Sequence, residues 1–177
     1  MMRQLPQNTI CKNVRKLGLL SSKLDEVLCG LYYLPENVSV RDFAQRIGVS
    51  KSSVSVYLRK CKKLGLTKDS LYFKQKKIHF GIELLVKSGL IEYIITQLQP
   101  RCIILFGSFR KGEFDRKSDV DLFIESYNSS IDVSSFEKKL GHSVDLFIHD
   151  SISDVPSDLK ENIINGIKLY GSVKLAC

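Results

Sequence analysis

The chain has 177 residues, of which 44% are hydrophobic, and a formal net charge of +8 at pH 7. This length can bury one ordinary core or two small ones, because domains commonly begin at about 50 residues. No apolar run approaches the roughly 20 residues needed to cross a bilayer, and the N-terminal residues lack the apolar core of a signal peptide. We therefore expect a cytoplasmic protein with no membrane partner.

Cysteine and histidine give no sign of a metal centre. Their spacing fits neither a zinc site nor a redox dithiol, so we expect reduced thiols and assign no histidine as a ligand. The residues concerned are Cys11, Cys29, Cys61, Cys102, Cys177, His79, His142 and His149.

The charge is divided unevenly along the chain. Residues 1–98 hold 17 Lys and Arg against 7 Asp and Glu, whereas residues 99–177 hold 10 against 12. The first part therefore carries +10 and suggests a polyanionic partner, while the second carries −2 and suits a pocket in which carboxylates bind cations.

Residues 1–20 carry Pro6, several basic residues and no sustained apolar period, so we expect a loose or short docking segment. From Ser21 the pattern becomes helical. Ser21 or Ser22 can cap a helix that Pro35 ends.

Two further helices are predicted, each with a serine cap. Ser39 can cap a short helix that ends at Gly48, and Ser50 can cap another that ends at Gly65. The second of these turns mostly polar and basic residues outward: Lys51, Ser52, Ser53, Ser55, Tyr57, Arg59, Lys60 and Lys62.

The order of these elements resembles a winged helix-turn-helix over residues 21–80. Residues 66–80 mix apolar residues with lysines, among them Lys74, Lys76 and Lys77, and are expected to form a basic β-hairpin wing. The resemblance implies that residues 39–80 bind double-stranded DNA, or RNA instead. A plain helical bundle with a solvated lysine face is the alternative.

A second domain is expected over residues 82–177. Gly81 should break the preceding pattern, an amphipathic helix should run over residues 82–98, and Cys102 to Phe106 should form a buried strand. A helix over 133–140 and another from Pro156 to Tyr170 complete the expected elements.

A motif follows the expected strand. It places Gly107-Ser108 directly after the strand, then Gly112, then Ser118-Asp119-Val120-Asp121 at the start of the next strand. This pattern resembles the signature of the DNA polymerase beta superfamily of nucleotidyltransferases, and the short domain is similar to the minimal members. The fold expected is α+β, with a small mixed sheet flanked by helices. An Asp-rich turn between two strands is the alternative, although it would not require the glycines.

Three carboxylates form the expected site. Residues two apart on a strand point the same way, so Asp119 and Asp121 can face a pair of cations about 3.5–4 Å apart. Asp145 lies in a later segment that repeats the Val-Asp-Leu-Phe-Ile sequence beginning at Val120. By resemblance, the three would hold two Mg²⁺ ions, and Asp145 would help deprotonate the nucleophile. Asp145 could instead be a charge that keeps a strand edge soluble.

The glycine-serine turn is expected to bind the triphosphate. Gly107 lets the backbone approach a phosphate, and Ser108 can donate to its oxygens. Minimal family members often carry arginine where this chain has Lys111, so Arg110 and Lys111 are both candidates for the phosphate contact. Gly112 and Ser118 complete the expected nucleotide-binding set.

The resemblance implies transfer of a nucleotidyl group, AMP from ATP by default, to a hydroxyl of an acceptor that the motif does not identify. The alternative is a DNA-binding regulator or antitoxin whose second domain binds nucleotide or a protein partner such as a helical toxin. An intact set of three carboxylates favours the enzyme, because a sensor would not require it.

Overall fold

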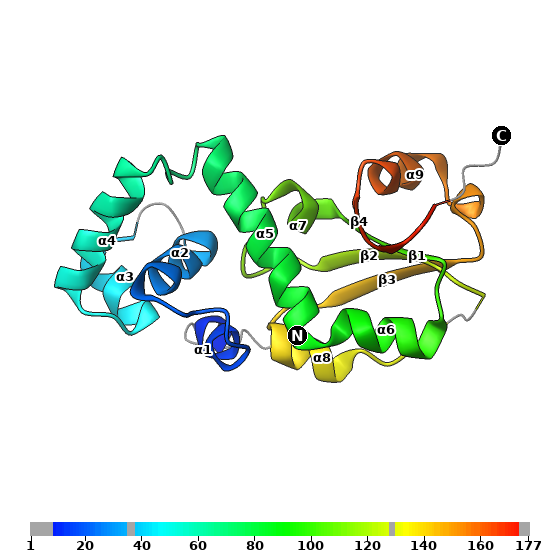
Figure 1. The fold of residues 1–177 in the computed structure, drawn as a ribbon, viewed down its shortest axis with the longest axis horizontal. Coiled ribbons are helices and arrows are strands. Elements are labelled where there is room, and N and C mark those ends of the chain that lie inside the picture. The colour runs from blue at the N-terminus through cyan, green and yellow to red at the C-terminus, as the bar shows by residue number, and fades with distance from the viewer. Residues whose placement is uncertain (1–8, 35–37, 128–129, 174–177) are drawn as a thin grey trace. The chain divides into compact units, whose positions relative to one another are not determined.

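The computed structural model describes residues 9–34, 38–127 and 130–173 (Figure 1). These residues divide into two compact units, one ending at Leu84 and the other beginning at Leu85, called here the N-terminal and C-terminal units. No helix of the described ranges is both long and apolar enough to span a membrane.

All regular elements in the described part of the N-terminal unit are helices. Its helices are α1 (Thr9–Lys16), α2 (Lys23–Tyr33), α3 (Val40–Ile47), α4 (Lys51–Lys63) and the larger part of α5 (Leu71–Ser88). The predicted caps are confirmed: the side chains of Ser22, Ser39 and Ser50 accept backbone N–H groups at the starts of α2, α3 and α4. Gly48 ends α3 in the left-handed conformation, with φ of 72°.

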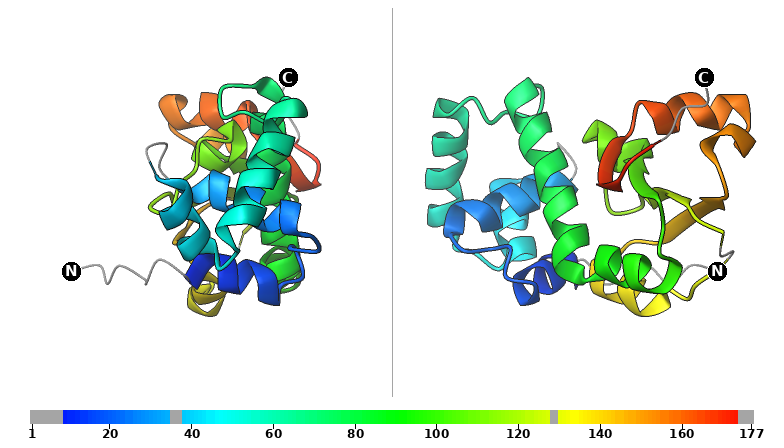
Figure 2. Two further views of the ribbon diagram at one scale, coloured as in Figure 1. Left: turned by 90° about the vertical axis from the view of Figure 1, so that its left-hand side faces the viewer. Right: turned by 45° about the vertical axis from the view of Figure 1, so that its right-hand side comes forward.

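Helices α2, α3 and α4 pack against one another around a shared apolar core (Figure 2). Phe43, Ile47 and Val54 are buried in it. Gly30 of α2 lies so close to α3 that a Cβ there would stand 2.7 Å from Ile47 Cγ2. The arrangement therefore depends on a glycine at the helix crossing as well as on apolar burial.

The predicted β-hairpin wing over residues 66–80 is wrong. Those residues form a turn followed by the first part of α5, and the Ser70 side chain accepts the backbone N–H of Phe73, as a helix cap does. Strand alternation would have placed Leu71 and Phe73 on one face, but Phe73 is buried while Leu71 is 72% exposed. A helix instead places Phe73 and Leu84, about three turns apart, on one face, and both are buried.

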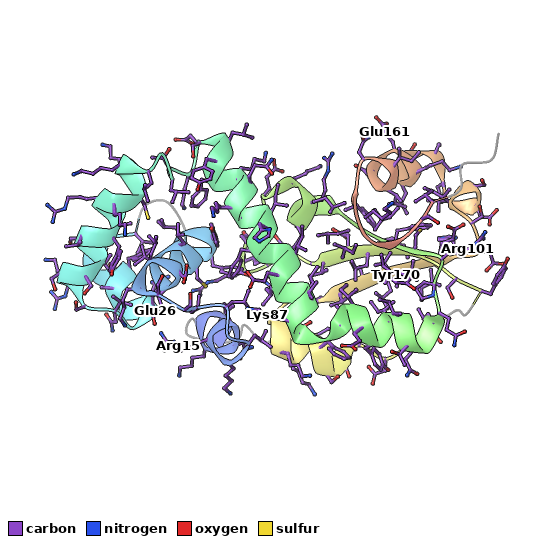
Figure 3. The ribbon with its side chains drawn as sticks, in the orientation of Figure 1. Arg15, Glu26, Lys87, Arg101, Glu161 and Tyr170 are labelled. Carbon is purple, nitrogen blue, oxygen red and sulfur yellow. The ribbon has the colours of Figure 1, made fainter. Side chains whose placement is uncertain are left out.

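Two other sequence expectations for this part of the chain need correction. Gly81 does not break a helix, since it lies inside α5; the break comes at Gly89, whose φ of 84° separates α5 from α6 (Leu90–Leu98). Of the two expectations for residues 1–20, a loose segment is wrong for the described residues from Thr9 on, a docking segment stays a prediction, and residues 1–8 with Pro6 lie outside the described ranges. Helix α1 buries Val14 and its Arg15 pairs with Glu26 of α2 at 2.7 Å (Figure 3).

The C-terminal unit is built on one mixed sheet with strand order β3-β2-β1-β4, which confirms the α+β expectation. Strand β1 is antiparallel to β2 and β4, whereas β2 and β3 are parallel. The elements after α6 are β1 (Cys102–Phe106), α7 (Gly107–Lys111), β2 (Val120–Glu125), α8 (Ser134–Leu140), β3 (Val144–His149), η1 (Ile152–Asp154), α9 (Ser157–Ile164) and β4 (Ile167–Gly171).

Helices cover both faces of this sheet. Helix α9 lies on one face, while α6 and α8 lie on the other (Figure 1). On the α9 side, Ile104 and Phe106 of β1 and Phe123 of β2 form a buried cluster with Ile163 of α9. These apolar side chains form the core between α9 and the face of the sheet that carries Phe123.

The predicted helix from Pro156 to Tyr170 is too long. Helix α9 ends at Ile164, and Ile167–Gly171 is strand β4. The intervening Gly166 packs so tightly that a Cβ would stand 2.9 Å from the Leu105 carbonyl oxygen. Glycine therefore lets the chain turn directly against β1 and pair with it.

Candidate active site

The parallel pairing of β2 and β3 brings two of the predicted carboxylates together. Asp121 and Asp145 are register partners, so their side chains leave the same face of the sheet from neighbouring strands. Asp119 precedes β2 by one residue. Asp119 and Asp145 are exposed, and Asp121 is half-buried.

These carboxylates influence one another electrostatically. Burial, then the negative charge of Asp145, then that of Asp119 raise the pKa of Asp121 from 3.8 to about 6. No cation is among these causes. At this end of the sheet, both charged neighbours that shift the pKa of Asp121 are therefore carboxylates.

The donor set fits a hard divalent cation in its chemistry, because all three side chains offer carboxylate oxygens. The side chains are nevertheless not gathered round one point: within the described ranges, no three or more His, Cys, Asp or Glu side chains form a group that could hold a metal ion. The raised pKa of Asp121 still indicates that the carboxylates are close enough to repel.

The chain passes directly against Asp121 at Gly107. A Cβ at Gly107 would collide with the Asp121 carboxylate, and Gly107 has φ of 65°. Both observations require glycine there. The predicted turn and the predicted carboxylates are therefore neighbours in space, fourteen positions apart in the sequence.

The remaining nucleotide-binding candidates lie on α7 and the loop after it. Ser108 and Arg110 are half-buried and Lys111 is exposed, all three on α7. Gly112 ends α7 with φ of 67°. The structure thus places Arg110 and Lys111 on the same short helix and leaves both as candidates.

Ser118, which is also a nucleotide-binding candidate, lies in the loop before β2. Its hydroxyl accepts the Asp115 N–H at 2.8 Å and is 3.2 Å from Asp115 Oδ1, to which it can donate. The side chain therefore stabilises the loop before β2, and these hydrogen bonds stay within that loop.

His142 is the residue that sequence analysis missed. It is 5% exposed, its Nδ1 lies 2.7 Å from the Ser118 carbonyl oxygen, and its ring meets Phe109 and Phe114 edge-on. Burial lowers the pKa of His142 more than its neighbours raise it, so the ring is neutral at pH 7. The signal available in the sequence was its place three residues before Asp145.

The opposite end of the sheet carries a compensated charge. Glu125 of β2 is 2% exposed and pairs with Arg101 at 3.2 Å, while the Cys102 thiol can donate to Glu125 at 3.6 Å (Figure 3). Burial first, and then the charge of Glu125, raise the pKa of Cys102 to about 11. That thiol is therefore unreactive at neutral pH.

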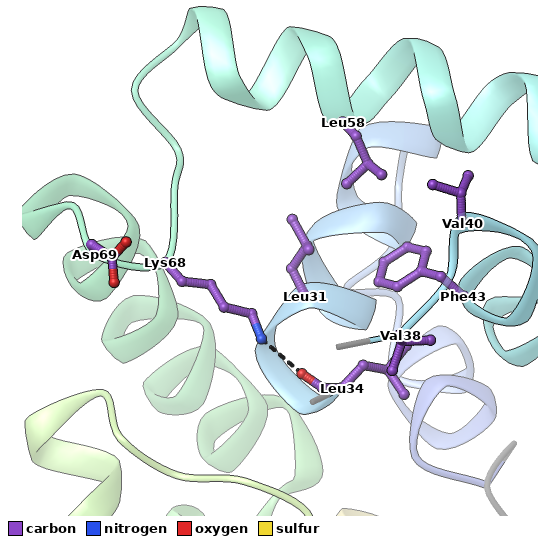
Figure 4. A pocket seen from close by; sticks show the side chains of 8 residues that line it. All are labelled: Leu31, Leu34, Val38, Val40, Phe43, Leu58, Lys68 and Asp69. Atoms are coloured by element: carbon purple, nitrogen blue, oxygen red, sulfur yellow. Dashed lines mark hydrogen bonds between the residues drawn. The ribbon is translucent and has the colours of Figure 1, made fainter. Parts of the chain in front are cut away.

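The N-terminal unit has a pocket of its own. It is lined by Leu31, Leu34, Val38, Val40, Phe43, Leu58, Lys68 and Asp69, and the Lys68 ammonium donates to the Leu34 carbonyl at 2.8 Å (Figure 4). It contains none of the predicted catalytic or nucleotide-binding residues.

The predicted nucleic-acid contacts gather on α4 and the first turns of α5. Most are exposed or half-buried, but Lys77 is 9% exposed and differs from its neighbours. Ser53 also takes part in the cap of α4, where its backbone N–H donates to Ser50 Oγ. The exposed or half-buried members of the predicted set are Lys51, Ser52, Ser53, Ser55, Tyr57, Arg59, Lys60, Lys74 and Lys76.

Comparison with known families agrees with the geometry of the C-terminal unit. Residues 87–170 match the family model described as a nucleotidyltransferase domain, and the matched range includes Asp119, Asp121 and Asp145. No curated protein and no solved structure matches the chain. The match supports the nucleotidyltransferase superfamily for this unit, and with it a transferase activity.

Proposed function

We propose that the C-terminal unit transfers a nucleotidyl group, AMP from ATP, to a hydroxyl of an acceptor. The observation that carries the proposal is the juxtaposition of Asp121 with Asp145 across the parallel strands and with the Gly107 backbone. A protein that leaves such a charge cluster unbalanced loses stability, so a cation-dependent role is the physical reason to keep it.

The reaction is a substitution at the α-phosphorus. The acceptor oxygen forms a bond to that phosphorus, the bond to the oxygen bridging the α- and β-phosphates breaks, and pyrophosphate leaves. The hydroxyl proton passes to a carboxylate, for which we propose Asp145 because it is exposed and a carboxylate suffices as the base.

Asp119, Asp121 and Asp145 would hold two Mg²⁺ ions. When bound, such ions neutralise triphosphate charge and lower the pKa of the attacking hydroxyl. The chain's own part is to fix the carboxylates on two paired strands and to bring the Gly107 backbone beside them.

The triphosphate contacts are proposed for Gly107, Ser108 and one basic residue of α7. Arg110→Gln and Lys111→Gln separate the two basic candidates. The substitution that removes the phosphate contact should raise KM for ATP about tenfold, the usual cost of one charge-assisted hydrogen bond, whereas the other should leave it unchanged.

The proposal is tested with α-labelled nucleoside triphosphates, Mg²⁺ and candidate acceptors. Wild type should transfer label, and Asp119→Ala should abolish transfer by removing a metal ligand. Asp150→Ala is the matched control, because Asp150 is exposed and lies just after β3, at the other end of the sheet. Equal labelling by wild type and Asp119→Ala would defeat the enzyme assignment.

Nucleotide binding without transfer would instead favour the alternative function, a regulator or antitoxin. In that case titration of labelled ATP should show binding that Arg110 or Lys111 contributes to, while no acceptor becomes labelled. Binding of a helical protein partner in addition to nucleotide would favour the antitoxin form of that alternative.

A second function is proposed for the N-terminal unit: binding of double-stranded DNA by α4. The observation that favours it is a basic helix packed on α2 and α3 through a tight turn at Gly48, with Lys51, Arg59 and Lys60 exposed. This order of helices supports the helix-turn-helix interpretation, in which exposed cations on the last helix would contact phosphates.

Fluorescence anisotropy with a labelled duplex tests this second function. Affinity should fall steeply between 50 and 200 mM salt, and replacing Lys51, Arg59 and Lys60 by Gln should lower the salt slope by about 2 to 3. Replacing three exposed lysines of the C-terminal unit, Lys138, Lys139 and Lys168, by Gln is the control. Tighter binding of single-stranded RNA, or a flat salt response, would reject DNA as the partner.

A further inference from the structure

His142 joins the two segments that lead into the carboxylate-bearing strands. Its Nδ1 lies 2.7 Å from the Ser118 carbonyl oxygen, and the next residue, Ser143, accepts the Val120 N–H at 2.9 Å. These two hydrogen bonds fall on either side of Asp119. The backbone that carries Asp119 is therefore fastened to the start of β3, which carries Asp145.

The first of these bonds fixes the state of the ring. A carbonyl oxygen only accepts, so Nδ1 must carry the hydrogen. The Ser118 carbonyl and the Asp119 N–H share one planar peptide unit. Holding the oxygen of that unit thus restricts the backbone orientation of Asp119 itself.

The ring also fastens α7 to the same place. Phe109 of α7 and Phe114 of the following loop stack with centroids 4.1 Å apart, and the His142 ring stands perpendicular to Phe109 at 5.1 Å. Such edge-to-face contacts are favourable beyond their area burial. One buried side chain of the segment before β3 therefore contacts both the helix that carries Ser108 and the loop before β2.

We infer that His142 is a positioning residue for the acidic site: its Nδ1–H holds the Ser118 peptide and so sets Asp119 relative to Asp121 and Asp145. The catalytic consequence rests on the proposed nucleotidyl transfer, whereas the positioning itself does not. Residues that support metal ligands in this way typically contribute 10–100-fold to activity or metal affinity.

Two substitutions separate the hydrogen bond from the packing. His142→Phe keeps an aromatic ring against Phe109 and Phe114 but has no donor. His142→Asn can place an amide N–H near the position of Nδ1. Relative to wild type, we expect His142→Phe to need about tenfold more Mg²⁺ for half-maximal label transfer and to have lower kcat, with KM for ATP little changed, and His142→Asn to recover most of the loss.

Amide hydrogen exchange supplies a measurement that does not depend on activity. In His142→Phe the Val120 amide should exchange at least about tenfold faster than in wild type, because its hydrogen bond to Ser143 loses the adjacent restraint. His149→Phe is the matched control: His149 lies at the other end of β3, stacks on Phe123, and should leave Val120 exchange unchanged.

The outcomes separate this inference from the proposed function. Label transfer by wild type with equal Val120 exchange and equal Mg²⁺ dependence in His142→Phe would overturn the inference alone. Absence of label transfer by wild type would defeat the proposed function, and the exchange comparison would still decide the inference.

Should His142→Phe fail to fold, His142→Gln replaces it, since its amide reaches toward the position of Nε2 instead of Nδ1. Equal Val120 exchange in the Asn and Gln variants would overturn the positioning role.

Discussion

The two ends of strand β2 carry the same kind of side chain in opposite electrostatic circumstances. Asp121 and Glu125 are four residues apart, so they point to the same face of the sheet. Glu125 is paired with Arg101 at 3.2 Å, whereas the neighbours that shift the pKa of Asp121 are two further carboxylates. Glu125 is therefore a buried carboxylate with a cationic partner, whereas the charged neighbours that shift the pKa of Asp121 are carboxylates, as the proposed cation-binding role of that end would require.

On this difference we base the proposal that Glu125 has a structural role and Asp121 a functional one. A paired buried charge is costly to break, because the remaining partner is left alone in a poorly solvated place. A repelling cluster is costly to keep, so removing one of its members should relieve the protein while destroying its chemistry. The predictions below test each side of that contrast.

The largest effect is expected at the unbalanced end. Asp121→Asn keeps the size of the side chain but removes the charge that would hold a metal ion. The rate of label transfer should therefore fall by more than about 100-fold, which is more than the loss of a residue that only supports a metal ligand would cause. The measurement is the rate of labelled-nucleotide transfer at saturating Mg²⁺. Retention of wild-type rates would place Asp121 outside the reacting site.

A smaller effect of the opposite kind is expected at the balanced end. Arg101→Met leaves Glu125 buried without its cation. Because Arg101 is 45% exposed, solvent screens the pair, and the loss is smaller than for a fully buried pair. We expect the free energy of unfolding to fall by about 2 kcal/mol. Urea unfolding measures this loss. Label transfer by the folded variant should stay at the wild-type level, and a selective loss of transfer would contradict the assignment of this end as structural.

Local hydrogen bonding explains why much of the fold could be predicted. Ser22, Ser39 and Ser50 cap helices by bonds that reach only three residues along the chain, so a sequence window contains all the information. The paired strands around the carboxylates were also predictable, because Val120 and Val144 begin the same repeated apolar pattern.

Distant contacts explain the failures. The residues of β4 continue the apolar spacing of α9, so Asn165-Gly166 was the one local sign of a turn, and pairing with β1, more than sixty positions earlier, makes them a strand. His142 likewise acquires its role from a carbonyl 24 residues away. The partners in these two contacts are far apart in the sequence, whereas Asp119 and Asp121 could be recognised because they stand two residues apart.

The smallest effect expected is the pH dependence of stability at the unbalanced end. The pKa of Asp121 is about 6 in the folded protein and 3.8 ordinarily, so between about pH 4 and pH 6 the folded state binds a proton that the unfolded state has lost. Stability from this residue must therefore fall as pH rises through that window. The shift corresponds to about 3 kcal/mol in full, and solvent screening at a half-buried group reduces it to about 1 kcal/mol.

Urea unfolding of wild type and Asp121→Asn at pH 4 to 7, without divalent cations, measures the contribution of Asp121 to the free energy of unfolding. The free energy of unfolding of Asp121→Asn minus that of wild type should be about 1 kcal/mol larger above pH 6 than at pH 4. The reason is that asparagine takes up no proton and removes the repulsion. Contributions from other titrating groups, including His142, occur in both proteins and largely cancel in the difference. A difference curve that is flat across the window would mean that the charge at Asp121 is already compensated, and the contrast between the two ends of β2 would then be lost.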